Sequence, residues 1–179
     1  MNRYWFPDTS VLCNFAAVER IDLLKPEFVD RGRWTTAVAY EAERSAAFLA
    51  DLQQVIDGAW LGEPVETSER QAAVVERIRI AAFGGTPDKP FQHLGEAETC
   101  HVLRTRAEFS ESVWMTDDAA AYDYGRRTGL TTWSTRTLVE QMAAKAVTEE
   151  YTERMRPSSP GGSSSQAYLP DGSGREGGS

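Results

Sequence analysis

The chain has 179 residues, of which 41% are hydrophobic, so it is long enough to bury one core. Its formal net charge of −8 argues against a protein that coats nucleic acid through overall positive charge, although it leaves room for a local basic patch. Glycine, serine and proline dominate from Arg156 onward, and such a segment cannot bury enough apolar surface to offset its ordering entropy. We therefore expect one folded domain at 1–154 and a disordered tail at 155–179.

The N-terminal sequence, MNRYWFPDTS, lacks the basic region and apolar core of a secretory signal. No apolar run approaches the roughly twenty residues that span a bilayer. Cys13 and Cys100 lie far apart, without the paired spacing of a zinc site or a disulfide framework, and we expect two buried, reduced thiols. The sequence thus predicts a soluble, cytoplasmic protein with no membrane segment.

Short apolar runs alternate with longer segments of helical period, a pattern typical of βαβ units around a parallel sheet. The first strand is predicted at 4–7. The helix after it has apolar residues at helical spacing, and its buried face should use Val11, Leu12 and Phe15. The predicted fold class is therefore α/β.

Proline and glycine limit the predicted helices of the next segment. A short second helix around Leu23 should be interrupted by Pro26, because a proline in a helix interior removes a hydrogen bond and clashes with the preceding turn. A second strand is predicted at 33–36. One long helix then covers 38–56 and stops at Gly58.

The second half of the chain has the clearest periodicity. Residues 69–83 form an amphipathic pattern that Gly84 should close, and a loop leads to a helix over 95–104. The remaining predicted elements are a strand at 113–116, a helix at 119–127, a strand at 131–133 and a last helix that begins near Thr135.

Six acidic residues occupy equivalent positions in the predicted secondary structure. They follow a strand or lie in the first turns of a helix, and the set is Asp8, Glu41, Glu96, Glu98, Asp117 and Asp118. In an open parallel sheet, the carboxyl ends of the strands and the neighbouring helix N-termini line one crevice, where ligands bind. We therefore expect these carboxylates to converge.

Converging carboxylates repel one another unless a cation lies among them. Oxygen ligands of this kind suit Mg²⁺ or Mn²⁺, and such an ion can activate water for hydrolysis of a phosphodiester bond. Each acid also has an ordinary explanation: Asp8, Asp117 and Asp118 as helix caps, Glu41 and Glu43 as solvated surface residues, and Glu96 and Glu98 as partners of a helix dipole. The joint placement favours the metal site.

Four stretches, PDTSVL, TTAVAYEAE, LGEAETCHVL and MTDDAAAYDYGRRTGL, resemble in order and separation the PIN-domain family of metal-dependent nucleases, which includes the VapC-type toxins of bacterial toxin–antitoxin pairs. The resemblance implies a three-layer α/β/α, Rossmann-like fold with a central, mainly parallel sheet. It also implies ribonuclease activity with Mg²⁺ or Mn²⁺, an RNA substrate, and, for a toxin, a small antitoxin partner and a homodimer.

The family's acids fall, by this resemblance, on Asp8, Glu41, Glu96 and Asp117. Glu96 stands where the family usually has an aspartate, Glu98 is the competing choice, and Asp118 can substitute for Asp117. Ser10 matches the family's small hydroxyl residue near the first acid, and Thr116 has a similar supporting place. Two features depart from the small toxins: the long span between Glu41 and Glu96, and the C-terminal tail.

Cations and histidines add fewer constraints. Arg126 and Arg127 are candidates for contact with a nucleic-acid backbone, as are Arg104, Arg106 and Arg136, although cations near helix C-termini are also stabilising by themselves. His93 and His101 carry no paired ligand motif and are expected to be structural.

Two other functions compete with the nuclease. A binding module that keeps the fold but cleaves nothing is the main alternative. An aspartyl-phosphate phosphotransferase is disfavoured, because no lysine stands at the end of a late strand to bind phosphoryl oxygens.

Overall fold

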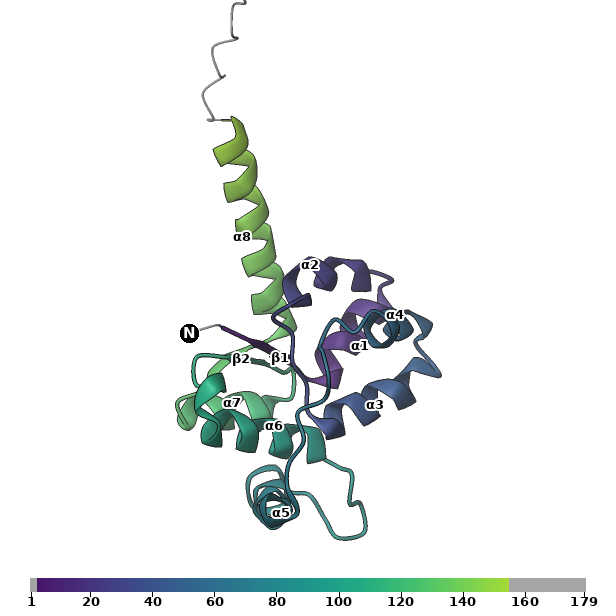
Figure 1. Cartoon of the computed structure of the whole chain (residues 1–179), viewed down its shortest axis with the longest axis vertical. Coiled ribbons are helices and arrows are strands. Elements are labelled where there is room, and N and C mark those ends of the chain that lie inside the picture. The colour runs from purple at the N-terminus through teal and green to yellow at the C-terminus, as the bar shows by residue number, and fades with distance from the viewer. Residues whose placement is uncertain (1–2, 155–179) are drawn as a thin grey trace, which may run out of the picture. The chain divides into compact units, whose positions relative to one another are not determined.

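The computed structural model describes residues 3–154, which form a three-stranded parallel sheet and eight α-helices (Figure 1). The strands are β1 (Trp5–Pro7), β2 (Val113–Met115) and β3 (Thr131–Trp133), in the order β1-β2-β3. Trp5 pairs with Val113 and Val113 pairs with Thr131. The α/β class and the parallel sheet are confirmed. The predicted tail at 155–179 lies outside the described residues.

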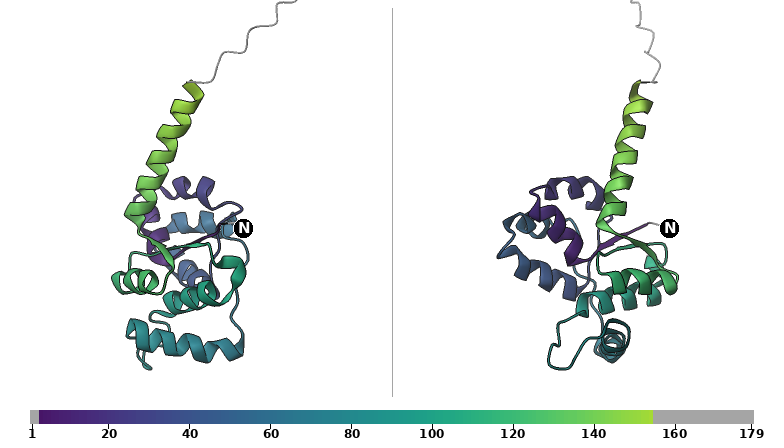
Figure 2. Two further views of the ribbon diagram at one scale, coloured as in Figure 1. Left: turned by 90° about the vertical axis from the view of Figure 1, so that its left-hand side faces the viewer. Right: turned by 180° about the vertical axis from the view of Figure 1, so that it is seen from behind.

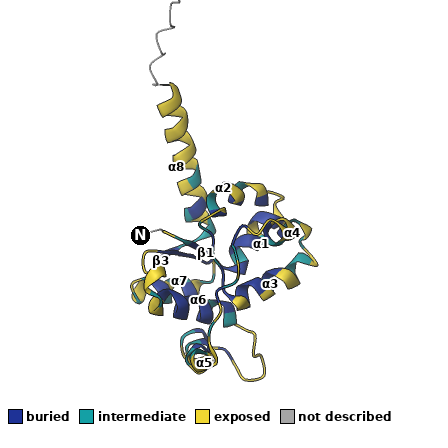
Figure 3. Ribbon diagram, viewed as in Figure 1, coloured by how far each residue is buried: buried dark blue, intermediate teal, exposed yellow. Residues whose placement is uncertain are grey.

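Side chains of the sheet alternate between two hydrophobic clusters, as the two-residue period of a strand requires. Trp5 and Met115 belong to a cluster with helices from the first part of the chain. Phe6 and Trp114 belong to a cluster with the helices α5 (Glu69–Phe83), α6 (Leu94–Thr105) and α7 (Ala119–Arg127). Figure 2 shows the purple and blue helices on one side of the sheet and the teal and green helices α5–α7 on the other. Both faces of β1 and β2 are therefore buried, whereas β3 is partly exposed (Figure 3).

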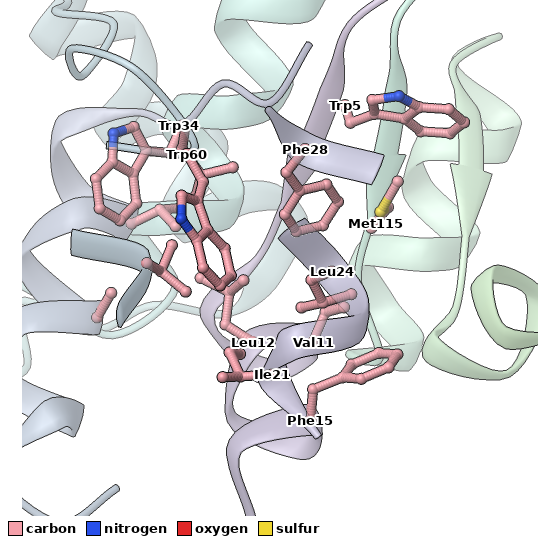
Figure 4. Packing of buried hydrophobic residues seen from close by; sticks show 14 of the residues in the cluster. Trp5, Val11, Leu12, Phe15, Ile21, Leu24, Phe28, Trp34, Trp60 and Met115 are labelled. Carbon is pink, nitrogen blue, oxygen red and sulfur yellow. The ribbon is translucent and has the colours of Figure 1, made fainter. Parts of the chain in front are cut away.

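The first helix, α1 (Thr9–Ala17), has the predicted buried face, and Figure 4 shows Val11, Leu12 and Phe15 packed among the rings of the first cluster. The prediction for Pro26 was wrong. A short 3₁₀ turn, η1 (Ile21–Leu24), runs into α2 (Lys25–Phe28), and Pro26 lies in the first turn of α2. A proline is tolerated there because the first N–H groups of a helix have no intrahelical partner.

The predicted strand at 33–36 was also wrong. Trp5 forms an isolated parallel bridge with Gly32, Thr35 forms another with Val65, and α3 (Thr36–Ala46) begins directly afterwards. The segment therefore runs along the edge of β1 and forms only two hydrogen bonds with it. Trp5 N donates to Arg31 O, and Arg33 N donates to Trp5 O. It turns into a helix before a ladder can form.

The helix predicted over 38–56 is broken into three pieces, although it stops at Gly58 as expected. They are α3, the 3₁₀ turn η2 (Ala50–Leu52) and α4 (Gln53–Asp57). The break lets Leu52 and Val55 enter the first cluster, in which both are fully buried. Local periodicity cannot reveal a break that tertiary packing selects.

The later elements follow the sequence closely. Helix α5 (Glu69–Phe83) starts with a capping box between Ser68 and Gln71 and ends at Gly84, whose φ of 72° is the left-handed conformation of a helix terminator. The remaining helical elements, in chain order, are α6 (Leu94–Thr105), the 3₁₀ turn η3 (Ala107–Phe109), α7 (Ala119–Arg127) and α8 (Thr135–Arg154).

The chain divides into two compact units, one that ends at Ala144 and one that starts at Lys145. The first unit contains the sheet and both clusters. The described part of the second unit, 145–154, is helical and exposed. A single domain over 1–154 stays a prediction. None of the helices within 3–154 combines the length and the apolar character that a membrane crossing requires.

Candidate metal centre

Asp8 lies at the carboxyl end of β1, beside the carboxyl end of β2. Its N–H donates to Met115 O at 2.7 Å, and the residue is only 5% exposed. The hydroxyls of Ser10 and Thr116 donate to its Oδ2 at 2.6 and 3.4 Å. Asp8 occupies the N-cap position of α1 without a geometrically formed capping hydrogen bond, and the backbone N–H groups of Thr9 and Ser10 lower its pKa by less than burial raises it.

Glu41 reaches the same place from α3. Its Oε2 accepts a hydrogen bond of 3.0 Å from the hydroxyl of Thr9, the residue that follows Asp8. Gly95, in the first turn of α6, lies so close that a Cβ there would be 3.3 Å from Glu41 Oε2. The absence of a side chain at Gly95 thus allows α6 to approach Glu41.

The first turn of α6 supplies a third carboxylate and an imidazole. Glu96 Oε1 lies 3.2 Å from Nδ1 of His93, the N-cap residue of α6. His93 has a φ of 60°, which is uncommon for a residue with a side chain and turns the chain sharply into the helix. His93 was expected to be structural. Its spacing of three residues from Glu96 in the sequence could have indicated that His93 lies in the site.

Burial and neighbouring negative charge raise the affinity of Asp8 and Glu41 for protons. The pKa of Asp8 is raised from 3.8 to about 6, first by burial and then by the charge of Glu96. The pKa of Glu41 is raised from 4.5 to about 7 by burial and by Asp8, with a smaller contribution from Glu96. The hydroxyl of Thr9 and the charge of His93 oppose the rise at Glu41. A cation at this place would offset the repulsion among these carboxylates and stabilise their charged forms.

Asp118 joins this group from the loop after β2. Single ligand atoms of His93, Glu96 and Asp118 all lie within 4.8 Å of one another, and all three residues are half-buried. Asp118 is also the N-cap of α7, because its Oδ1 accepts from Ala121 N at 2.7 Å. The carboxylate of Asp118 therefore caps α7 and also offers a ligand atom close to those of His93 and Glu96.

Asp117 is engaged differently. Its Oδ1 accepts from Thr135 N at 2.9 Å and its Oδ2 accepts from Asn14 Nδ2 at 2.8 Å and from the hydroxyl of Thr135. These bonds tie the end of β2 to α1 and to the start of α8. The carboxylate of Asp117 is exposed, and its partners hold it as a structural anchor beside the site.

Glu98 faces away from this centre. It is 7% exposed, and its oxygens accept from Ala37 N at 2.8 Å and from the Thr67 hydroxyl at 2.7 Å. Ala37 lies in the first turn of α3, so Glu98 satisfies one of the free N–H groups there and complements the helix dipole. Of the two glutamates in the sequence GEAE, the structure thus brings Glu96 to Asp8 and Glu41.

Arg79 holds the loop that leads to His93. Its side chain is 1% exposed, and its guanidinium donates to the carbonyls of Thr86, Lys89 and Gln92 at 3.0–3.2 Å. Two further bonds of 2.7 Å join it to Glu76 in α5. A Cβ on Gly85 would lie 2.4 Å from Nη1 of Arg79, so the loop closes tightly over the guanidinium.

The candidate phosphate-binding arginines lie elsewhere. Arg126 and Arg127 are exposed in the last turn of α7, and Arg126 stacks over Tyr122 at 5.9 Å. Asp118 caps the opposite end of this helix, about 12 Å away at 1.5 Å per residue. Arg44 instead shares a cavity with a site carboxylate, because it lines a hollow of about 370 Å³ together with Thr9, Glu41, Ser45 and Phe48.

The donor set is hard and mostly anionic, with carboxylates from the ends of β1 and β2, from α3 and from α6, and one imidazole. Such a set fits Mg²⁺ or Mn²⁺, which prefer a few carboxylates with water in the remaining positions. A scan against known protein families finds no match to this chain, and a search of curated proteins finds none either.

Proposed function

We propose that this chain is a Mg²⁺- or Mn²⁺-dependent endoribonuclease with the three-layer α/β/α, Rossmann-like fold of the PIN-domain family. The observation that carries the proposal is the shared position of Asp8, Glu41 and Glu96. They come from three distant segments, yet burial and mutual repulsion raise the pKa of Asp8 to about 6 and that of Glu41 to about 7. Carboxyls whose pKa is raised by burial and by neighbouring negative charge cluster at functional sites, which supports the proposal.

Each residue has a role that follows from its contacts. Asp8, Glu41, Glu96 and Asp118 would hold the ion, with His93 as a further ligand or as the partner that orients Glu96. Ser10, Thr116 and Thr9 donate to these carboxylates and fix their rotamers. When bound, the ion supplies positive charge that stabilises the phosphoryl oxygens and activates water for phosphodiester hydrolysis.

The decisive experiment measures cleavage of a single-stranded RNA by the purified chain. We expect cleavage with Mn²⁺, none with EDTA, and a loss of at least about a hundredfold in Asp8→Asn, since the ion would lose its most buried ligand. Asp57→Asn is the matched control, because Asp57 is exposed at the end of α4 and contacts only Gln53 among the residues described. Activity that survives both EDTA and Asp8→Asn would refute the assignment.

A non-catalytic binding module is the second candidate. The engagement of Asp117 with Asn14 and Thr135 favours it, because the carboxylate that the family resemblance assigns to catalysis is committed to structural hydrogen bonds. RNA binding without cleavage in either metal would support this candidate. The role of a toxin, with a small antitoxin and a homodimer, extends the nuclease proposal, and growth arrest on expression that needs Asp8 would test it.

A further inference from the structure

An exposed row of aromatic rings and one arginine lies beside the acidic site. It consists of Tyr40, Arg44, Phe48 and Phe91, which we call the aromatic strip. We propose that the aromatic strip binds unpaired bases and one phosphate of a single-stranded RNA, and thereby places the next phosphodiester at the acidic site. This inference rests on the proposed function and names the part of the substrate that its site would recognise.

All three rings of the strip are exposed to solvent to a large extent. Phe48 is 89% exposed in the break between α3 and η2, Phe91 is 54% exposed in the loop before α6, and Tyr40 is 43% exposed on α3. Exposed large apolar side chains that gather in one place mark interaction sites. The break that interrupts the predicted long helix is the feature that turns Phe48 outward.

Contacts within the aromatic strip connect Tyr40, Phe91 and Arg44, and Phe48 lines the same cavity as Arg44. The rings of Tyr40 and Phe91 lie with centroids 5.7 Å apart, at an interplanar angle of 37°. The guanidinium carbon of Arg44 lies 5.7 Å from the Tyr40 ring, a distance at which a cation is attracted to the ring face. Tyr40 and Arg44 are four residues apart on α3 and so share one helix face.

A cavity joins the aromatic strip to the acidic site. It measures about 370 Å³, and its lining includes Phe48, Arg44 and Glu41. Glu41 in turn is bonded through Thr9 to the segment that carries Asp8. An RNA chain that passes from Phe48 across Arg44 therefore meets the carboxylate of Glu41 within the same hollow.

The chemistry of the strip favours single-stranded RNA over other occupants. Bases stack on aromatic rings regardless of sequence, and an adjacent cation binds the phosphate between them. Bases in a duplex have their faces covered, so unpaired RNA is required. An apolar protein helix, or a second copy of this chain, would have to remove water from Arg44 and Glu41 without supplying partners for their charges.

Fluorescence anisotropy of a labelled RNA tests the proposal without cleavage. The Asp8→Asn chain serves as the background, and the probes are an oligo-uridine of about ten nucleotides and an abasic oligomer of the same length. We expect the oligo-uridine to bind more tightly than the abasic oligomer. Adding Phe48→Ala should weaken binding of the oligo-uridine roughly fivefold or more and leave the abasic oligomer unchanged, whereas Phe48→Trp should preserve the difference.

Arg44 gives an independent readout through salt. Arg44→Ala should weaken both oligomers equally and reduce the slope of log affinity against log salt concentration by about 0.7, the value for one phosphate contact on a single strand. A structural role for Arg44 would leave this slope unchanged. Val18→Ala is the matched control, because Val18 is 65% exposed at the opposite end of α1 from Asp8.

The proposal would be overturned if the chain bound the two oligomers with equal affinity, or if Phe48→Ala left the affinity for oligo-uridine unchanged. So would self-association that Phe48→Ala abolishes while RNA binding persists, because the strip would then be an interface between copies. These outcomes are separate from the nuclease test, in which metal-dependent cleavage is measured with the intact site. A failure of the strip as a base-binding surface can thus be told apart from a failure of the nuclease proposal.

Discussion

The hydroxyl of Thr9 donates a hydrogen bond of 3.0 Å to Oε2 of Glu41 and so joins the first turn of α1 to α3. Thr9 follows Asp8 directly in the chain. The bond therefore keeps Glu41 close to Asp8, although the negative charge of Asp8 raises the pKa of Glu41. The fold holds together two carboxylates that repel each other, and this has consequences for stability.

The first prediction concerns pH. The pKa of Asp8 is raised to about 6 and that of Glu41 to about 7, so the folded chain binds their protons more tightly than the unfolded chain. Without metal, the contribution of these two carboxyls to the free energy of unfolding should be fully present below about pH 4 and should be lost as the pH rises through about 7. The loss is on the order of 1–3 kcal/mol for each carboxyl. Asp8→Asn should therefore melt above the wild-type chain at about pH 8 in EDTA and should lose that advantage near pH 4.

Thermal unfolding followed by circular dichroism at several pH values measures this difference. Asp57→Asn, an exposed change at the end of α4, controls for the general loss of an acidic charge. If Asp8→Asn were equally destabilising from pH 4 to pH 8, burial would not be acting on the charge of Asp8.

The second prediction separates the two glutamates of GEAE. Glu96 lies with His93 in the site, so Glu96→Gln should abolish most of the rise in melting temperature that Mn²⁺ causes. Glu98 accepts from Ala37 N and from the Thr67 hydroxyl, so Glu98→Gln should retain the Mn²⁺ effect but lower the metal-free free energy of unfolding by about 1–3 kcal/mol. Melting curves with Mn²⁺ and with EDTA test both. The reverse pattern would assign the metal to Glu98.

The third prediction separates Asp118 from Asp117. Asparagine caps a helix about as well as aspartate, so Asp118→Asn should keep the stability of α7 while Mn²⁺ binds roughly tenfold or more weakly. Asp117→Asn should instead weaken the bonds to Asn14 and Thr135 and lower stability by about 1 kcal/mol, with Mn²⁺ affinity nearly unchanged. Calorimetric titration gives the affinity and denaturant unfolding gives the stability. Equal loss of affinity in both variants would place both carboxylates on the ion.

The fourth prediction concerns Arg79 as a positioning residue. Arg79→Met leaves the carbonyls of Thr86, Lys89 and Gln92 without their buried donor, so it should destabilise the chain by about 3 kcal/mol or more. It should also make the loop at 84–93 sensitive to proteolysis and weaken Mn²⁺ binding, because His93 and Glu96 follow that loop.

Arg79→Lys should rescue little, since an ammonium cannot reproduce the planar set of donors. Arg77→Met, on the exposed face of the same helix, is the matched control. A stable Arg79→Met chain with an intact loop would show that the carbonyls find other partners.

Much of the fold follows from local pattern. The bounds of α5 and α7 and the position of β3 agree with the sequence because periodicity, capping residues and terminal glycines act within a few residues of one another. The segment at 33–36 and the break after Ala46 did not follow. Both depend on what a distant segment offers, an edge of β1 in the first case and room in the buried cluster for Leu52 in the second.

The sequence by itself determined that carboxylates follow two parallel strands and open the helix of GEAE, and a parallel arrangement brings those positions to one edge. Only the tertiary structure decided which carboxylate turns inward. Residues two apart on a helix point about 200° from each other, and adjacent residues after a strand point to opposite sides. Packing of α6 between Glu41 and the second cluster sets its rotation, and that rotation selects Glu96 and His93 for the site and leaves Glu98 to cap α3.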